Sequence, residues 1–213
     1  MISYRQVHMV TNQKSGFRLG LTGGIGSGKT SVGRVFDVLG IPVFSADREA
    51  SEIMETESEI KKDLNTITGT DLYSDGTLNR GRLSSIIFND CIVLQKVNSL
   101  VHPVVFDHFR KWVTNQTSPY VIMEAAILFE SGALEFVDRV TTVVSPVEER
   151  IDRVIKRNKL TREQVMERMR NQMDDESRIK LSDYIIYNSE NDMIIPAILK
   201  IHNEILTFIK AQT

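Results

Sequence analysis

Cysteine is nearly absent from this sequence. Cys91 is the only one among 213 residues, so no disulfide within the chain can stabilise the fold. Long uncharged apolar runs are also missing, and residues 1–16 lack the apolar core of a signal peptide. We therefore expect a cytoplasmic protein without a membrane partner, and we interpret residues 1–16 as a flexible N-terminal extension.

A strong net charge of either sign is missing as well. The chain has 26 Lys and Arg residues against 28 Asp and Glu residues, which leaves a formal net charge of −2. Such a surface offers no broad electrostatic attraction for nucleic acid. Any phosphate must therefore be bound at a local site on this protein, and we expect the partner that carries it to be a small molecule. The hydrophobic content of 41% and charged content of 25% exclude a disordered or collagen-like chain.

Short apolar segments rich in β-branched residues alternate with stretches of helical periodicity. This pattern predicts an α/β fold with a parallel sheet covered by helices on both faces. The predicted strands are residues 17–22, 41–46, 120–127, 139–144 and 183–187.

About seventy residues separate the second predicted strand from the third, and their apolar spacing is helical apart from a loop-like stretch at residues 68–83. We interpret residues 48–117 as a helical insertion over one edge of the sheet. Residues 17–47 and 118–213 then form the core.

A glycine-rich loop follows the first predicted strand. Gly23, Gly28, Lys29 and Thr30 match the pattern G-x-x-x-x-G-K-[ST], in which backbone N–H groups surround the phosphates of a nucleotide. Lysine reaches the β- and γ-phosphates in such loops, and the threonine hydroxyl binds Mg²⁺. A predicted helix from Lys29 to Leu39 adds N-terminal N–H groups that favour an anion. The loop residues expected at the phosphates are Gly23, Gly24, Ile25, Gly26, Ser27 and Gly28.

Two carboxylates follow predicted strands. Asp47 comes after the second strand and Glu124 ends the stretch "YVIME" in the third. Because strand carboxyl ends line the ligand crevice of an open α/β sheet, Asp47 is suited to deprotonate an attacking hydroxyl. The residues alone leave an N-cap for the following helix equally open. Glu124 is likewise either a Mg²⁺ ligand through water or a polar residue at a strand end.

An arginine row occupies one stripe of a predicted helix from Val147 to Arg157. Its members are Arg150, Arg153 and Arg157. Arginine suits phosphate oxygens, and a helix that folds over a nucleotide could deliver it. A solvated helical hairpin is the alternative, because residues 146–180 carry ten basic and eight acidic side chains. His102 and Pro103, within the insertion, indicate a fixed turn.

In this order and spacing, the motifs resemble the dephospho-coenzyme A kinase family, from Phe17 to about Phe208. That family uses ATP to phosphorylate the ribose 3′-hydroxyl of dephospho-coenzyme A in the last step of coenzyme A synthesis. The segments that carry the resemblance are "LTGGIGSGKT", "SADREA", "DGTLNRGRLSSIIF", "LVHPVV", "AAILFESG", "RVIKRNKLTREQVMERMRNQ" and "SDYIIYNS".

The resemblance implies a P-loop NTPase-type fold in which the insertion binds the acceptor and residues 150–175 form a helical lid. It implies dephospho-coenzyme A as the small-molecule substrate, with ATP and Mg²⁺ as cofactors, in a monomer or small homo-oligomer. The implied catalytic residues are Asp47 as base, Lys29 and Arg153. The implied nucleotide contacts beyond the loop are Arg157 and Asn188. The implied acceptor contacts are Asp47, Arg80 and His102, and the expected Mg²⁺ ligands are Thr30 and Glu124.

Two positions depart from the family's pattern. Ser45 stands where members often have Asp, and Ala126 where they often have Pro. Two other functions stay open: a kinase for another nucleoside or nucleotide, and a regulatory protein that senses ATP without transferring its phosphate.

Overall fold

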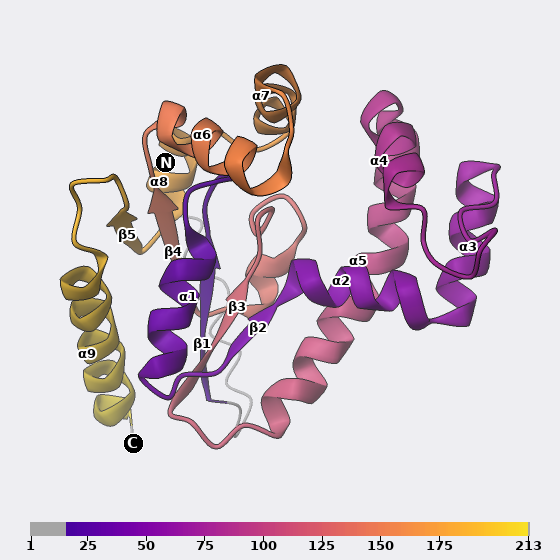
Figure 1. The fold of residues 1–213 in the computed structure, drawn as a ribbon. Coiled ribbons are helices and arrows are strands. Elements are labelled where there is room, and N and C mark those ends of the chain that lie inside the picture. Colours follow the sequence, from indigo (N-terminus) through magenta and orange to yellow (C-terminus); the bar gives the residue numbers. More distant parts are fainter. Residues whose placement is uncertain (1–15, 213) are drawn as a thin grey trace, which may run out of the picture.

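Five parallel strands lie at the centre of the computed structural model, which describes residues 16–212 (Figure 1). The strands are β1 (Phe17–Thr22), β2 (Val43–Ser45), β3 (Tyr120–Glu124), β4 (Arg139–Val144) and β5 (Tyr184–Tyr187). Their order is β2-β3-β1-β4-β5, and every pairing is parallel. The predicted sheet is confirmed, with a second and a third strand shorter than expected. The predicted extension at residues 1–16 lies, apart from Gly16, outside the described residues.

Helices fill most of the remaining described chain. They are α1 (Lys29–Val38), α2 (Ala46–Thr56), α3 (Ser58–Thr68), α4 (Arg80–Asn89), α5 (Cys91–Thr114), α6 (Val147–Asn158), α7 (Arg162–Arg170), α8 (Asp175–Leu181) and α9 (Ile194–Gln212), with a short 3-10 helix, η1 (Ala133–Phe136). The predicted helix after the glycine loop is therefore confirmed as α1. None of the helices within residues 16–212 is long and apolar enough to cross a lipid bilayer.

One face of the sheet is covered by α1 and α9. Leu19 of β1 and Ile122 of β3 belong to a buried cluster that also contains Phe36 of α1 and Ile201 of α9. Because successive strand residues point to opposite faces, β3 contributes to both faces and is buried along its whole length. Such burial explains why its sequence is a continuous apolar run.

The opposite face is covered by the C-terminal half of α5. Phe44 of β2 packs edge-on against Phe109 of α5, with 5.2 Å between ring centroids. Val121 and Met123 of β3 lie in the same buried cluster. The predicted insertion is thus more than an edge cover, because α5 also forms one of the two layers on the sheet. The helices α3 and α4 lie at its far end, away from the strands (Figure 1).

Pro103 lies inside α5, which continues from Cys91 to Thr114. The expectation of a fixed turn at His102 and Pro103 is therefore wrong. A proline lacks the N–H that would bond the carbonyl four residues earlier, and its ring crowds that carbonyl. Apolar contacts of the long helix with the sheet and with α2, α3 and α4 compensate for this local loss.

The N-terminus of α1 lacks the side-chain cap that α5, α7 and α8 have. Side chains of Asp90, Thr161 and Asp174 accept backbone N–H bonds at the starts of α5, α7 and α8. At the start of α1, the N-cap is Gly28, in a left-handed conformation with φ of 95°, and no side chain caps the helix. The N–H groups at this end are thus left for an anion.

Sheet topology brings the motifs together. From β1 the chain reaches β2 and β3 on one side and then crosses to β4 on the other, so β1 lies at the switch point of the sheet. Ligands of open α/β sheets bind beyond the carboxyl ends of strands at such a point. Glu124 is in register with Leu21 of β1 and Ser45 of β2, so the glycine loop and both carboxylates gather at one edge.

Candidate functional site

Lys29 is the buried cation of the glycine loop. Its side chain donates to the carbonyl of Gly23 at 2.8 Å, and the residue is only 9% exposed. Desolvation lowers its pKa from 10.5 to about 8, while the charges of Asp47 and Glu124 act in the opposite direction. Lys29 is thus mainly protonated at neutral pH, and a bound phosphate would stabilise that charge further.

Two glycines of the loop make room for protein neighbours. A Cβ at Gly24 would collide with the guanidinium of Arg150, and one at Gly28 would collide with the side-chain amide of Asn188. Gly28 also has the positive φ that favours glycine. The bare backbone therefore has a second cause besides space for phosphates, because helix α6 and the segment after β5 pack directly on the loop.

Thr30 and Glu124 form a pair suited to a hydrated metal ion. The Thr30 hydroxyl donates to Oε1 of Glu124 at 3.1 Å. Within residues 16–212, no group of three or more His, Cys, Asp or Glu side chains is arranged to hold a metal. Mg²⁺ at nucleotide sites typically keeps several waters and takes one or two protein oxygens plus phosphate, so this small donor set fits it.

Asp47 lies in the first turn of α2 and is not its N-cap, which is Ser45. The N-cap interpretation of Asp47 is therefore wrong. Its Oδ2 accepts the backbone N–H of Ala126 at 3.3 Å. Solvent reaches the carboxylate, but surrounding protein atoms still desolvate it and raise its pKa. The charge of Lys29, the Ala126 N–H and the charge of His102 act against this rise.

His102 of α5 is half-buried near Asp47. Burial lowers the pKa of His102, and the negative charge of Asp47 opposes that shift. The two residues come from different helices, α5 and α2, which pack against each other. The structure thus brings His102 within electrostatic reach of the carboxylate.

The arginines of the predicted row differ in burial and in hydrogen-bond partners. Arg153 donates to the hydroxyl of Ser145, to Glu149 and to the carbonyl of Asn188, at 2.9, 2.7 and 3.1 Å. Arg157 is exposed, and its Nε donates to the side chain of Asn158. Asn188 itself donates to the carbonyl of Ser27 at 2.7 Å, which ties the segment after β5 to the glycine loop.

A pocket of about 400 Å³ collects most of the predicted site. Its lining residues are Ile25, Gly26, Gly28, Lys29, Thr30, Ser31, Asp47, Glu124, Ala126, Arg153, Val154, Arg157 and Gln172. The phosphate loop, both carboxylates and two arginines therefore share one cavity. Arg80 does not line this pocket: it lies at the start of α4, exposed, with its guanidinium 3.4 Å from Glu55 of α2. His102 and Asn188 lie next to the lining residues.

Several residues at the site were not predicted. Gln172 accepts the N–H of Ile25 at 2.8 Å, although 147 positions separate the two residues. Asp175 is partly buried and forms ion pairs with two buried arginines, Arg178 and Arg150. Arg150 belongs to the predicted arginine row and Gln172 ends a segment that carries the family resemblance, but no contact was predicted for either. The other contacts depend on how α6 to α8 fold back onto the loop.

The chain is similar to known proteins over most of its length. A family model described as dephospho-CoA kinase matches residues 17–193. The dephospho-CoA kinase of Bacteroides fragilis strain YCH46 is 37% identical over 185 residues, 86% of this chain and 90% of the relative. That of Porphyromonas gingivalis is 34% identical over 190 residues, 89% and 94% of the two chains.

Solved structures are similar over the whole fold. The crystal structure of TT1252 from Thermus thermophilus has a TM-score of 0.78 at 29% identity, covering 91% of this chain and 98% of that one. The dephospho-CoA kinase from Campylobacter jejuni has a TM-score of 0.63 at 25% identity, with 92% and 98% covered. The similarity includes both the sheet and the helices around it.

Proposed function

Because the chain belongs to the dephospho-CoA kinase family, we propose that it transfers the γ-phosphoryl group of ATP to the ribose 3′-hydroxyl of dephospho-coenzyme A. The observation that carries this proposal is the shared pocket of the phosphate loop, Asp47 and two arginines. A protein that only senses ATP has no need of a carboxylate beside the phosphate site. Phosphoryl transfer to an alcohol needs one to orient and deprotonate the acceptor.

ATP binding falls to the phosphate loop and the helix behind it. The uncapped N-terminus of α1 and the ammonium of Lys29 would meet the β- and γ-phosphates. Mg²⁺ neutralises phosphate charge when bound, and the Thr30 hydroxyl and Glu124, through water, are the groups that would hold it. Arg153 and Arg157 also line the pocket, and their guanidinium groups would stabilise the negative charge on the phosphoryl group during its transfer.

Asp47 is the proposed base. The N–H of Ala126 orients its carboxylate, and desolvation makes it more basic than an ordinary aspartate. A proline at position 126 could not donate this bond. The departure from the family's pattern therefore gives this chain an additional contact to the base.

Acceptor binding is assigned to the helical segment of residues 48–117, with His102 next to the base. Arg80 would contact the acceptor only if that molecule extends toward α4, because the arginine does not line the pocket. We assign residues 17–47 and 118–213 to the nucleotide-binding core, and residues 150–175 to a lid that closes over ATP.

A turnover assay tests the proposal. Purified protein with ATP and Mg²⁺ is given dephospho-coenzyme A, adenosine, AMP or no acceptor. We expect a new 3′-phosphate on dephospho-coenzyme A and at most trace product in the other reactions. Preferred phosphorylation of AMP or adenosine would favour the alternative kinase, and ATP binding without any product would favour the sensor.

A further inference from the structure

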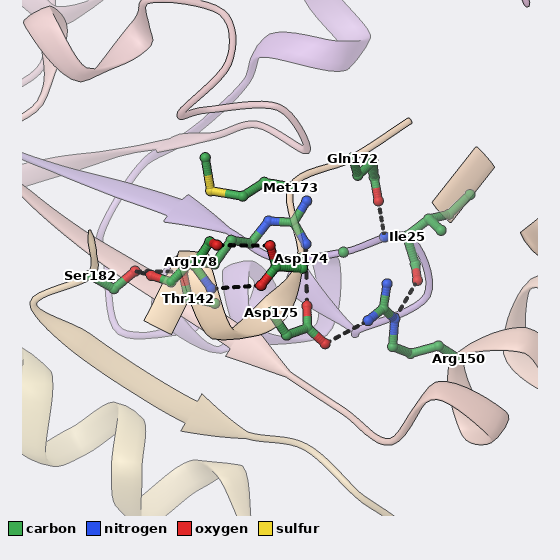
Figure 2. Close-up of polar contacts among 12 residues, drawn as sticks. Ile25, Thr142, Arg150, Gln172, Met173, Asp174, Asp175, Arg178 and Ser182 are labelled. Atoms are coloured by element: carbon green, nitrogen blue, oxygen red, sulfur yellow. Dashed lines mark hydrogen bonds and ion pairs between the residues drawn. The ribbon is translucent and has the colours of Figure 1, made fainter. Parts of the chain in front are cut away.

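Ile25, in the middle of the phosphate loop, is contacted on three sides by the lid segment, and Figure 2 shows its two backbone hydrogen bonds. Its N–H donates to Gln172 Oε1 at 2.8 Å, and its carbonyl accepts from Arg150 Nε at 3.0 Å. Its side chain packs against the small apolar cluster formed by Ile151 and Val154 of α6 and Val165 of α7. Both polar backbone groups and the side chain of one loop residue are therefore engaged by helices α6 and α7 and by Gln172, which follows α7.

Arg150 is buried and is fixed in this position by the partly buried carboxylate of Asp175. The residue is 5% exposed, and its Nη1 donates to Asp175 Oδ2 at 2.7 Å. Oδ1 of Asp175 accepts from Arg178 at 3.2 Å, and Arg178, 1% exposed, lies 3.7 Å from Glu130. Because buried charges need partners, loss of one carboxylate would leave the arginines uncompensated. The pairs thus join α6, α8 and the segment after β3 beneath the loop.

Position 24 of the loop must be glycine, because the Arg150 guanidinium fills the space that a side chain would need. A Cβ on Gly24 would occupy the place of the Arg150 guanidinium, and one on Gly26 would meet the Arg150 backbone. The charges of Arg150 and Arg178 also act on Lys29, whose pKa they lower. Geometry and charge therefore connect this pair of arginines to the phosphate site without placing them in the pocket's lining.

We propose that Arg150, oriented by Asp175, is a positioning residue that holds the phosphate loop at Ile25 and couples the loop to the lid hairpin α6–α7. The loop is thereby preformed for the phosphates of a nucleotide. Preorganisation lowers the entropic cost of binding, so its loss weakens affinity without removing any ligand contact. The choice of ATP as ligand rests on the proposed function.

Isothermal titration of the full chain with ATP and Mg²⁺, without acceptor, tests the inference. We compare wild type with Arg150→Gln and Asp175→Asn. Arg162→Gln is the matched control, because Arg162 is also a lid arginine paired with a carboxylate, Glu148, but on the exposed surface. Loss of a charged hydrogen bond corresponds to roughly a tenfold effect, so we expect the Kd for ATP to rise about tenfold in both variants and to stay unchanged in the control.

Steady-state kinetics separate positioning from a general structural role. We expect the KM for ATP to rise in parallel with Kd, while the KM for dephospho-coenzyme A changes by less than about twofold. Arg150→Gln and Asp175→Asn together are expected to be no worse than the more damaging single change, because the two residues act as one unit. Arg150→Lys retains the charge but cannot reach both partners in the same geometry, so its affinity should be intermediate.

A lower melting temperature with an unchanged Kd for ATP in folded Arg150→Gln would overturn the inference. If that variant does not fold, Arg150→Lys and Gln172→Met replace it, and unchanged ATP affinity in both has the same meaning. If wild type binds ATP but phosphorylates no acceptor, the proposed function fails. The comparison of Kd values still decides whether Arg150 positions the loop.

Discussion

At the scale of single residues, Asp47 has chemistry that its neighbours set. Desolvation raises its pKa, while Lys29, the Ala126 N–H and His102 hold that rise back. These groups come from α1, the segment after β3 and α5, so the balance exists only in the folded chain. The raised pKa makes the ionised carboxylate a stronger proton acceptor than an ordinary aspartate, which suits proton abstraction from an alcohol.

Substitution of Asp47 by Asn tests this assignment. The amide keeps the shape of the side chain but cannot accept the proton, so we expect kcat to fall by about 10²–10⁴-fold. The Kd for ATP should change by less than about twofold, because the phosphates are bound elsewhere in the pocket. Initial rates and titration calorimetry measure the two quantities. Near-normal turnover would remove Asp47 as the base.

Glu124 provides a second test at this scale. If Glu124 holds Mg²⁺ through water, Glu124→Gln should raise the Mg²⁺ concentration for half-maximal activity by about 10–100-fold. Activity is measured at saturating ATP over a magnesium titration. Glu135→Gln, an exposed change in η1, serves as the control and should not shift the curve. The same Mg²⁺ dependence for both variants would exclude Glu124 from the metal site.

At the scale of secondary-structure elements, strand and helix identity followed the local sequence closely. β1, the glycine loop and α1 lie where the apolar run and the helical spacing predicted them. Pro103 is the exception, because local rules predict a break where α5 continues. The helix persists since its apolar face, which includes Val101 and Val105 on either side of the proline, is buried in the core.

Replacement of Pro103 measures the free-energy cost of a proline inside α5, which the apolar contacts of the helix must offset. Pro103 is exposed, so alanine leaves no cavity and supplies an N–H for the carbonyl of Ser99. Interior proline costs about 3 kcal/mol in a helix, and part of the gain is offset because alanine makes the unfolded chain more flexible. We expect Pro103→Ala to raise the free energy of unfolding by about 1–2 kcal/mol in urea titrations.

Gln95→Ala, at another exposed position of α5, is the control and should change that free energy by less than about 0.5 kcal/mol. A fall in stability on replacing Pro103 would instead indicate that α5 needs the proline's geometry for its packing on the sheet.

At the scale of the whole molecule, two apolar layers on the sheet provide the stability and the helical segments at its carboxyl edge provide the site. In the layer formed by α9, the Tyr120 hydroxyl of β3 and Nδ1 of His202 share a hydrogen bond of 2.8 Å. Burial lowers the pKa of His202 and raises that of Tyr120. In the tautomer with its proton on Nε2, His202 accepts from the Tyr120 hydroxyl at Nδ1; protonation turns Nδ1 into a donor, and the hydroxyl oxygen must then accept.

The pH dependence of stability follows from the lowered pKa of His202. Its unfolded pKa is about 6.5, so below that pH the unfolded chain binds more protons than the native one. The contribution of neutral His202 to the free energy of unfolding is therefore complete above pH 6.5, and it is lost as the pH falls below that value. We expect His202→Gln to lose less stability than wild type between pH 7.5 and 5.

Urea titrations at several pH values measure this difference. His102 has a pKa shifted in the same direction and remains in the variant, so the slope should become shallower without vanishing. Equal slopes for wild type and His202→Gln would contradict the role of His202.

The sequence by itself determined the strands, the helix after the glycine loop, the phosphate-binding motif and the candidate base, because these signals depend on residues close together in the chain. Only the tertiary structure decided that Asp47 is not a helix cap and that α5 covers a face of the sheet. It alone joined Ile25 to Arg150 and Gln172, which lie 125 and 147 positions away. Such contacts require helices and loop to pack together, and no local pattern encodes which distant side chain will meet a given backbone group.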